Sequence, residues 1–96
     1  MIVLFINGSP LLLSAVSRNK EDGTLKGGFV ENGSWDLKIR NGKAYAYGWE
    51  GGRHATSWPI EKLQEIEVPK EMRTDPGKRY NEIIHWAEKQ LTEKQS

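Results

Sequence analysis

The stretch SWDLKIRNGKAYAYGW, residues 34–49, has the pattern of a complete β-hairpin. Side chains of two kinds alternate on both sides of Asn41-Gly42, a dipeptide that favours a two-residue type I′ turn. That turn sets Arg40 opposite Lys43 and fixes the pairing of every residue outward from it. The stretch therefore predicts two antiparallel strands whose side chains divide between two faces.

The two faces of this hairpin differ in composition. One face is apolar, with large residues on the first strand opposite small ones on the second: Trp35, Leu37, Ile39, Ala44, Ala46 and Gly48. Such a face suits close packing by a helix. The other face combines aromatic and basic residues with one acid: Asp36, Lys38, Arg40, Lys43, Tyr45, Tyr47 and Trp49. This second face is the candidate binding surface.

Turn signals recur through the first half of the chain. They lie at Asn7-Gly8, 21–23, Asn32-Gly33, Asn41-Gly42 and 50–52. This spacing predicts an antiparallel meander with strands at 2–6, 25–31, 34–40, 43–49, 53–58 and 65–68. The segment 11–17 is open between a strand and a helix, and we favour a strand.

The turn at Asn32-Gly33 admits two registers. A two-residue turn would place Lys26 on the apolar face. One extra residue, with a left-handed glycine in a bulge, instead aligns Phe29 with Leu37 and leaves Lys26 on the polar face. We predict the second register because it buries Phe29.

A helix is expected at the C-terminal end of the chain. Asp75 suits its N-cap and Pro76 its first position, and an apolar stripe follows at Tyr80, Ile83, Ile84, Ala87 and Leu91. Before it, proline ends the meander at Trp58-Pro59, and residues 59–63 resemble a single helical turn.

The predicted fold class is α+β. We expect a twisted antiparallel meander sheet, or a partly open small barrel, of five to seven short strands with one C-terminal helix packed on a face. We expect residues 1–96 to form a single domain. Its parts would be a β-rich meander at 1–58, a short turn, strand and linker at 59–75, the helix at 76–93 and a frayed tail at 94–96.

Composition restricts the function classes. The chain has 96 residues and no cysteine, so it has neither a disulfide framework nor a thiolate for metal binding or catalysis. Its 14 lysines and arginines nearly balance 13 acids, which requires any electrostatic site to be a local patch. No run approaches the roughly 20 apolar residues of a membrane span. We expect a soluble, cytoplasmic protein without a membrane partner.

The segment LFINGSP, residues 4–10, resembles the first strand and phosphate loop of NAD(P)H-dependent FMN reductases of the flavodoxin-like class. The resemblance implies that Gly8 and Ser9 would hold the FMN phosphate. It covers only about ten residues, and Leu11 stands where that family has a basic residue. The hairpins that follow cannot supply the β-α units of a doubly wound sheet. We therefore interpret Asn7-Gly8 as a turn and predict no cofactor.

Two further patterns contain residue types of catalytic or metal sites. Glu82 and His85 have the Glu-x-x-His spacing of di-metal carboxylate sites, but the chain holds no second copy of that motif. His54, Ser57 and Asp36 include the residue types of a nucleophilic triad, yet three-residue spacing in a strand points His54 and Ser57 to opposite faces. We predict no catalytic residue and no metal site.

The predicted binding site combines the polar hairpin face with the loop beside it: Lys38, Arg40, Lys43, Tyr45, Tyr47, Trp49, Arg53 and His54. An alternative is that the sheet curls into a small barrel and buries the two tyrosines and Trp49 against Trp58. A homodimer through an exposed aromatic patch is a further option.

Three functions fit these residues. The first hypothesis is a non-catalytic module that binds a protein partner, such as an inhibitor or adaptor from a phage or mobile element, because Trp, Tyr and Arg dominate interface hot spots. The second is single-stranded nucleic-acid binding by stacking and phosphate attraction. The third is a small metal-independent ribonuclease or toxin that uses Arg53 and His54.

Overall fold

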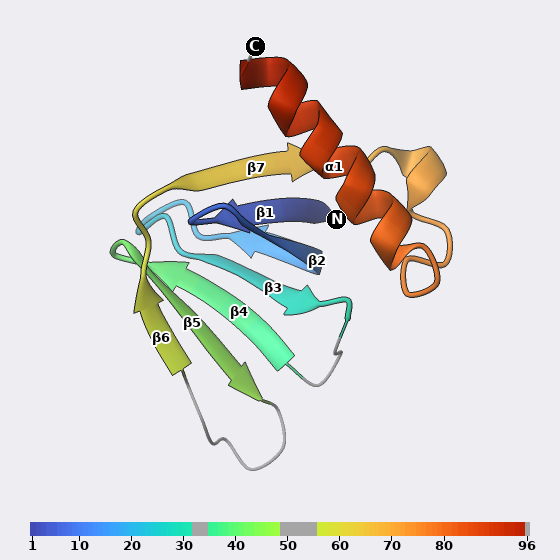
Figure 1. Ribbon diagram of the computed structural model, residues 1–96. Helices are drawn as coiled ribbons and strands as arrows, with labels where there is room; N and C mark the ends of the chain where they lie inside the picture. Colours follow the sequence, from blue (N-terminus) through green and yellow to red (C-terminus); the bar gives the residue numbers. More distant parts are fainter. Residues whose placement is uncertain (32–34, 49–55, 96) are drawn as a thin grey trace.

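The computed structural model describes residues 1–31, 35–48 and 56–95, and these ranges form an α+β fold, as predicted. In these ranges seven antiparallel strands and two helices follow one another: β1 (Ile2–Ile6), β2 (Ser9–Arg18), β3 (Leu25–Phe29), β4 (Trp35–Arg40), β5 (Lys43–Gly48), β6 (Thr56–Pro59), β7 (Leu63–Glu67), the 3₁₀ helix η2 (Lys70–Met72) and α1 (Tyr80–Gln95). The strands form one open sheet in the order β6-β5-β4-β3-β2-β1-β7 (Figure 1). Each of the six predicted strands overlaps one of these, and the open segment 11–17 lies within β2.

The two Asn-Gly turns within the described ranges have the expected chemistry. Asn7 and Gly8 have φ angles of 52° and 87°, and Asn41 and Gly42 have φ angles of 52° and 74°. Two successive left-handed residues define the type I′ turn, whose twist matches that of the flanking strands. Asn7-Gly8 therefore joins two antiparallel strands and starts no helix. The hairpin register predicted outward from Asn41-Gly42 is observed at every pair of β4 and β5.

The predicted pairing of β3 with β4 is wrong by two residues, although the faces are right. Gly27, and not Phe29, lies opposite Leu37. Because side chains in a strand alternate with a period of two, a two-residue shift changes the partners but leaves each side chain on its face. Lys26 thus lies on the same face as Lys38, its partner in β4.

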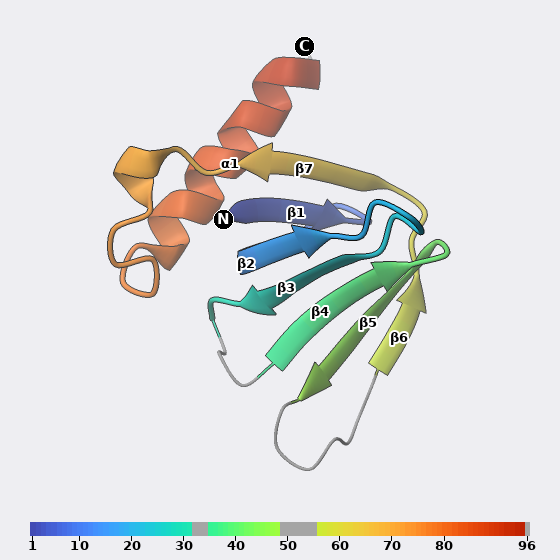
Figure 2. The ribbon, with the colours of Figure 1, turned by 180° about the vertical axis from the view of Figure 1, so that it is seen from behind.

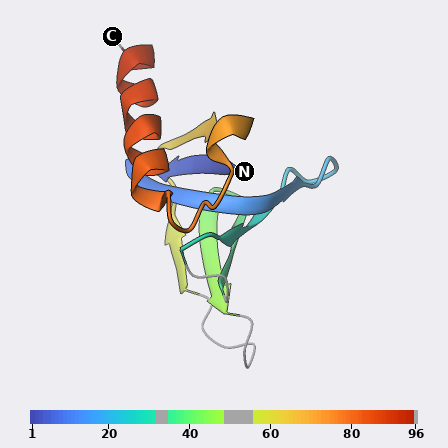
Figure 3. The ribbon, with the colours of Figure 1, turned by 90° about the vertical axis from the view of Figure 1, so that its right-hand side faces the viewer.

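The sheet has a helix face, on which α1 packs, and an opposite concave face. Under α1 the helix face is apolar. Val3, Phe5, Leu12 and Ile66 of the sheet form one buried cluster with Val68 and with Ile83, Ile84 and Ala87 of the helix. Figures 1 and 2 show α1 lying over the β7 end of the sheet, and Figure 3 shows the green strands β4 and β5 away from it. One end of the helix face is therefore covered by α1.

The concave face holds the second buried cluster, which comprises Ile2, Leu4, Ile6, Leu13, Leu25, Leu37 and Ala44. Its members come from β1 to β5, so the sheet must curl for their side chains to pack together. An ion pair between Arg18 of β2 and Glu65 of β7 crosses the same side. The apolar face of the β4–β5 hairpin packs here, against β1 and β2. The expectation that a helix covers it is wrong, because α1 lies on the opposite face.

The connection between β6 and β7 contains no helical turn, contrary to the expectation for residues 59–63. The Asn7 side chain holds it instead. Asn7 Oδ1 accepts hydrogen bonds from the main-chain N–H groups of Glu61 and Lys62, at 2.7 and 3.1 Å. Asn7 Nδ2 donates to the Pro59 carbonyl at 3.0 Å. The first turn of the chain thereby fixes the crossover between the two edge strands.

Helix α1 begins at Tyr80, four residues after the predicted start. Asp75 has a φ angle of 54°, and its carbonyl accepts hydrogen bonds from the N–H groups of Lys78 and Arg79. An N-cap residue needs an extended backbone, so left-handed Asp75 closes a separate turn and does not cap the helix. The helix itself extends to Gln95.

Candidate functional site

Five of the eight predicted site residues lie together on the part of the helix face that α1 leaves uncovered. They are Lys38, Arg40, Lys43, Tyr45 and Tyr47, on β4 and β5. The pairs Lys38–Tyr45, Arg40–Lys43 and Asp36–Tyr47 face each other across the two strands. Trp49, Arg53 and His54 lie outside the described residues. Arg53 and His54 are the two residues on which the ribonuclease hypothesis depends.

The two tyrosines do not pack against Trp58, as the closed-barrel alternative would require. Trp58 lies opposite Ala44 and belongs to the cluster on the concave face. Tyr45 and Tyr47 point to the other side of the sheet, where both are half-buried. Their ring surfaces are therefore partly accessible on the helix face.

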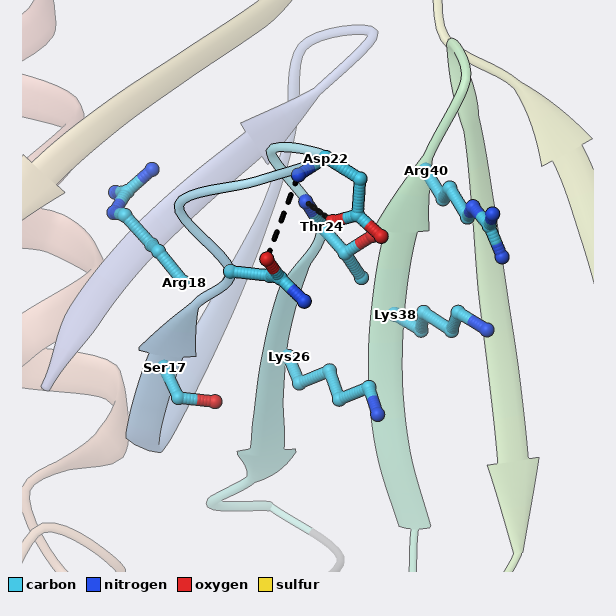
Figure 4. A pocket seen from close by; sticks show the side chains of 8 residues that line it. Ser17, Arg18, Asp22, Thr24, Lys26, Lys38 and Arg40 are labelled. Carbon is cyan, nitrogen blue, oxygen red and sulfur yellow. Dashed lines mark hydrogen bonds between the residues drawn. The ribbon is translucent and has the colours of Figure 1, made fainter.

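A hollow of about 310 Å³, here called the basic hollow, opens beside these residues on β2, β3 and β4. It is lined by Ser17, Arg18, Asn19, Asp22, Thr24, Lys26, Lys38 and Arg40. Figure 4 shows the Lys26, Lys38 and Arg40 side chains pointing the same way, whereas Arg18 points away from them. Arg18 instead pairs with Glu65, so it adds no free cation to this hollow.

Lys26, Lys38 and Arg40 make no ion pair with any residue in the described ranges. Lys26 and Lys38 are direct cross-strand partners, and like charges in that position destabilise a sheet. Arg40 follows two residues later on the same face as Lys38. Three neighbouring cations of one sign form a local positive patch, although the whole chain carries a net charge of only +1.

The rim of the basic hollow is an ordered loop between β2 and β3. The Asn19 carboxamide oxygen accepts a hydrogen bond from the Glu21 N–H at 2.8 Å, and the Asp22 carboxylate accepts one from the Thr24 N–H at 2.9 Å. This second bond is the main reason that the pKa of Asp22 lies below its ordinary value. The Thr24 hydroxyl, which is buried near that carboxylate without completing a hydrogen bond, and the charge of Arg40 add to the lowering.

A second hollow of about 240 Å³, here called the tyrosine hollow, adjoins the first. It is lined by Ala15, Lys26, Gly27, Gly28, Asp36 and Tyr47, and Lys26 belongs to both hollows. Burial raises the pKa of the Tyr47 hydroxyl above its ordinary value of 10.0, and the Asp36 carboxylate raises it further. The tyrosine ring is therefore neutral at physiological pH.

The sequence did not identify the β2 and β3 side of this site. The alternation of side chains predicts the face of Lys26 but not its place in the site, and no pattern in the sequence points to Ser17 or Asn19. A bulge in β2 brings them there: Ser14 pairs with Gly28 but Ser17 pairs with Lys26, with left-handed Ala15 between them. The one signal in the sequence for this side of the site is the polar turn at 21–23. The pairing of β3 with β4 brings this turn to the same hollow as Arg40.

Comparisons of the chain with protein-family models, with curated proteins and with solved structures found no match. In the described ranges, no group of three or more His, Cys, Asp or Glu side chains is placed to hold a metal ion. Nor do those ranges include a helix with the length and apolarity that crossing a bilayer requires. Any assignment of function rests on the geometry of the two hollows.

Proposed function

We propose that this protein binds single-stranded nucleic acid on the uncovered part of its helix face. The observation that carries the proposal is the cluster of Lys26, Lys38 and Arg40, three cations without an ion pair in the described ranges, beside the partly exposed rings of Tyr45 and Tyr47. Proteins that bind single strands combine a positive groove along the backbone with aromatic rings on which bases stack.

The alternative is a protein partner, which was the first hypothesis from the sequence. Tyrosine and arginine suit both kinds of partner. Neighbouring lysines favour the nucleic acid, because lysine is depleted in protein interfaces whereas phosphates attract it. The bases of a duplex are stacked on each other, so the tyrosines favour a single strand.

The test is a fluorescence anisotropy titration with labelled single-stranded RNA and DNA over a range of salt concentrations. The charge variant carries Lys26→Ala, Lys38→Ala and Arg40→Ala. The matched control carries Lys70→Ala, Lys78→Ala and Lys89→Ala, which remove the same net charge elsewhere on the exposed surface.

We expect the wild type and the control to bind alike and the charge variant to bind weakly. Each phosphate contact of a single strand contributes about 0.7 to the slope of log affinity against log salt, so loss of three contacts should reduce that slope by about 2. Equal loss in the control, or no binding by the wild type at low salt, would contradict the proposal. The second result would return the protein-partner hypothesis to first place.

A further inference from the structure

We infer that the basic hollow and the tyrosine hollow together form one nucleotide subsite, with a phosphate in the first and the attached base in the second. This inference rests on the proposed function and adds to it which part of the ligand lies in each hollow. The ligand of this subsite is a phosphate-bearing nucleotide unit within a single strand.

The two hollows are adjacent and differ in character. They share Lys26, so a ligand that occupies both crosses this side chain without leaving the surface. Three of the four cationic residues that line the basic hollow have no ion pair in the described ranges, whereas glycine, alanine and a tyrosine ring contribute most of the lining of the tyrosine hollow. A nucleotide has the same division between a charged phosphate and a flat base with an apolar face.

The phosphate end of the subsite is centred on Lys26 and Lys38. These lysines face each other across β3 and β4 and repel in the free protein, so an anion between them relieves that repulsion. Arg40 lies further along β4, at the end of the hollow that Asp22 also lines, and the two side chains attract each other. The negative charge of Asp22 disfavours an anion at the Arg40 end. Asp36, which lines the tyrosine hollow with Lys26, adds negative charge at the other end, so the position between the two lysines is the one that suits a phosphate.

The base end of the subsite exists because residue 28 has no side chain. A Cβ atom there would lie 3.3 Å from Asp36 Oδ1 and 3.8 Å from Ser14 Oγ, on the side of the sheet where Tyr47 lies. Gly28 is not in the left-handed region, so its backbone does not require glycine. Its small size leaves open the space beside the Tyr47 ring, where a base can stack.

Gly28→Val tests this arrangement without changing any charge. Valine favours a strand, and its side chain would occupy the part of the tyrosine hollow next to residue 28. The probes are a labelled single strand and a strand of equal length and phosphate number whose central nucleotides are abasic. The matched control is Ser9→Val, an exposed position on β2 that pairs with Ile6 on the concave side and lines neither hollow.

We expect Gly28→Val to weaken binding of the base-bearing strand about 10-fold or more and to leave binding of the abasic strand unchanged. Lys26→Ala should weaken binding of both strands. Unchanged affinity of Gly28→Val for the base-bearing strand, or equal losses for both strands, would overturn the inference while leaving the proposed function standing. Failure of the wild type to bind either strand would overturn both.

A second variant keeps the test decisive if Gly28→Val does not fold, as judged by circular dichroism. Tyr47→Leu removes the aromatic ring but retains an apolar side chain of moderate size, and Tyr47→Phe retains the ring. The inference expects Tyr47→Leu to lose affinity for the base-bearing strand alone and Tyr47→Phe to bind like the wild type. Equal binding by these two variants would contradict a stacked base at this position.

Discussion

The two ends of the sheet are built from similar strands but are buried differently. In β1, Val3, Leu4 and Phe5 are 0%, 1% and 2% exposed, so both faces of that strand are covered. In β4, Leu37 is fully buried on the concave face, whereas Lys38 on the helix face is partly exposed. The difference arises from α1, which packs at the β7, β1 and β2 end only.

This contrast has a simple geometric cause. An α-helix is about 10 Å across with its side chains, whereas seven strands spaced about 4.8 Å apart make a sheet about three times as wide. One helix therefore leaves most of a seven-stranded face uncovered. The covered end of the helix face is aliphatic and aromatic and stabilises the fold. The uncovered end carries lysine, arginine and tyrosine and is the surface on which we propose that a ligand binds.

The largest expected effect of a single substitution lies at the covered end. Phe5→Ala should lower the free energy of unfolding by about 3–5 kcal/mol, because it removes a fully buried ring and leaves a cavity beneath α1. Urea denaturation followed by circular dichroism measures this loss. The matched control is Tyr45→Ala, an aromatic truncation at the uncovered end of the same face, and its cost should be clearly smaller. Equal costs would mean that something also covers Tyr45 in solution.

An intermediate effect is expected at Asn7, which links the two edges of the sheet. Asn7→Ala should cost about 1–3 kcal/mol, since it removes three side-chain hydrogen bonds, each worth about 1 kcal/mol or less at an exposed position, and leaves a left-handed alanine. Asn41→Ala is the matched control, because Asn41 has the same φ angle and, within the described residues, its side chain makes no hydrogen bond to a crossover. The difference between the two variants isolates the hydrogen bonds. A larger loss for Asn41→Ala would contradict this role of Asn7.

The smallest expected effect is a pH dependence at the uncovered end. Because burial and Asp36 raise the pKa of Tyr47 in the folded state, its contribution to stability is complete below pH 10.0 and is lost as the pH rises through the folded-state pKa. A titration of the Tyr47 ring by NMR should find a pKa above 10.0. Asp36→Asn should lower it, and an unchanged value in that variant would show that the carboxylate has no part in the shift.

The two ends of the sheet also differ in how much of their structure could be predicted from the sequence. At the uncovered end, the register of β4 with β5 and the faces of Lys38, Tyr45 and Tyr47 followed from the Asn41-Gly42 turn alone. At the covered end, the apolar stripe of α1 was evident, but its start and the face that it covers were not. The basic hollow combines both cases. The face on which Lys26 lies followed from the alternation of side chains along β3, whereas the positions of its neighbours on β2 depend on a bulge in that strand.

The sequence by itself determined the features that depend on a few neighbouring residues. Left-handed turn residues set the two hairpins, and a period of two set the side of each strand residue. Only the tertiary structure decided which face α1 covers, which carbonyl and amide groups Asn7 binds and how Lys26 and Lys38 share a hollow with the loop at 19–24. These features join residues that are distant in sequence, so they depend on the curl of the whole sheet, and packing across that curl has no local signature in the chain.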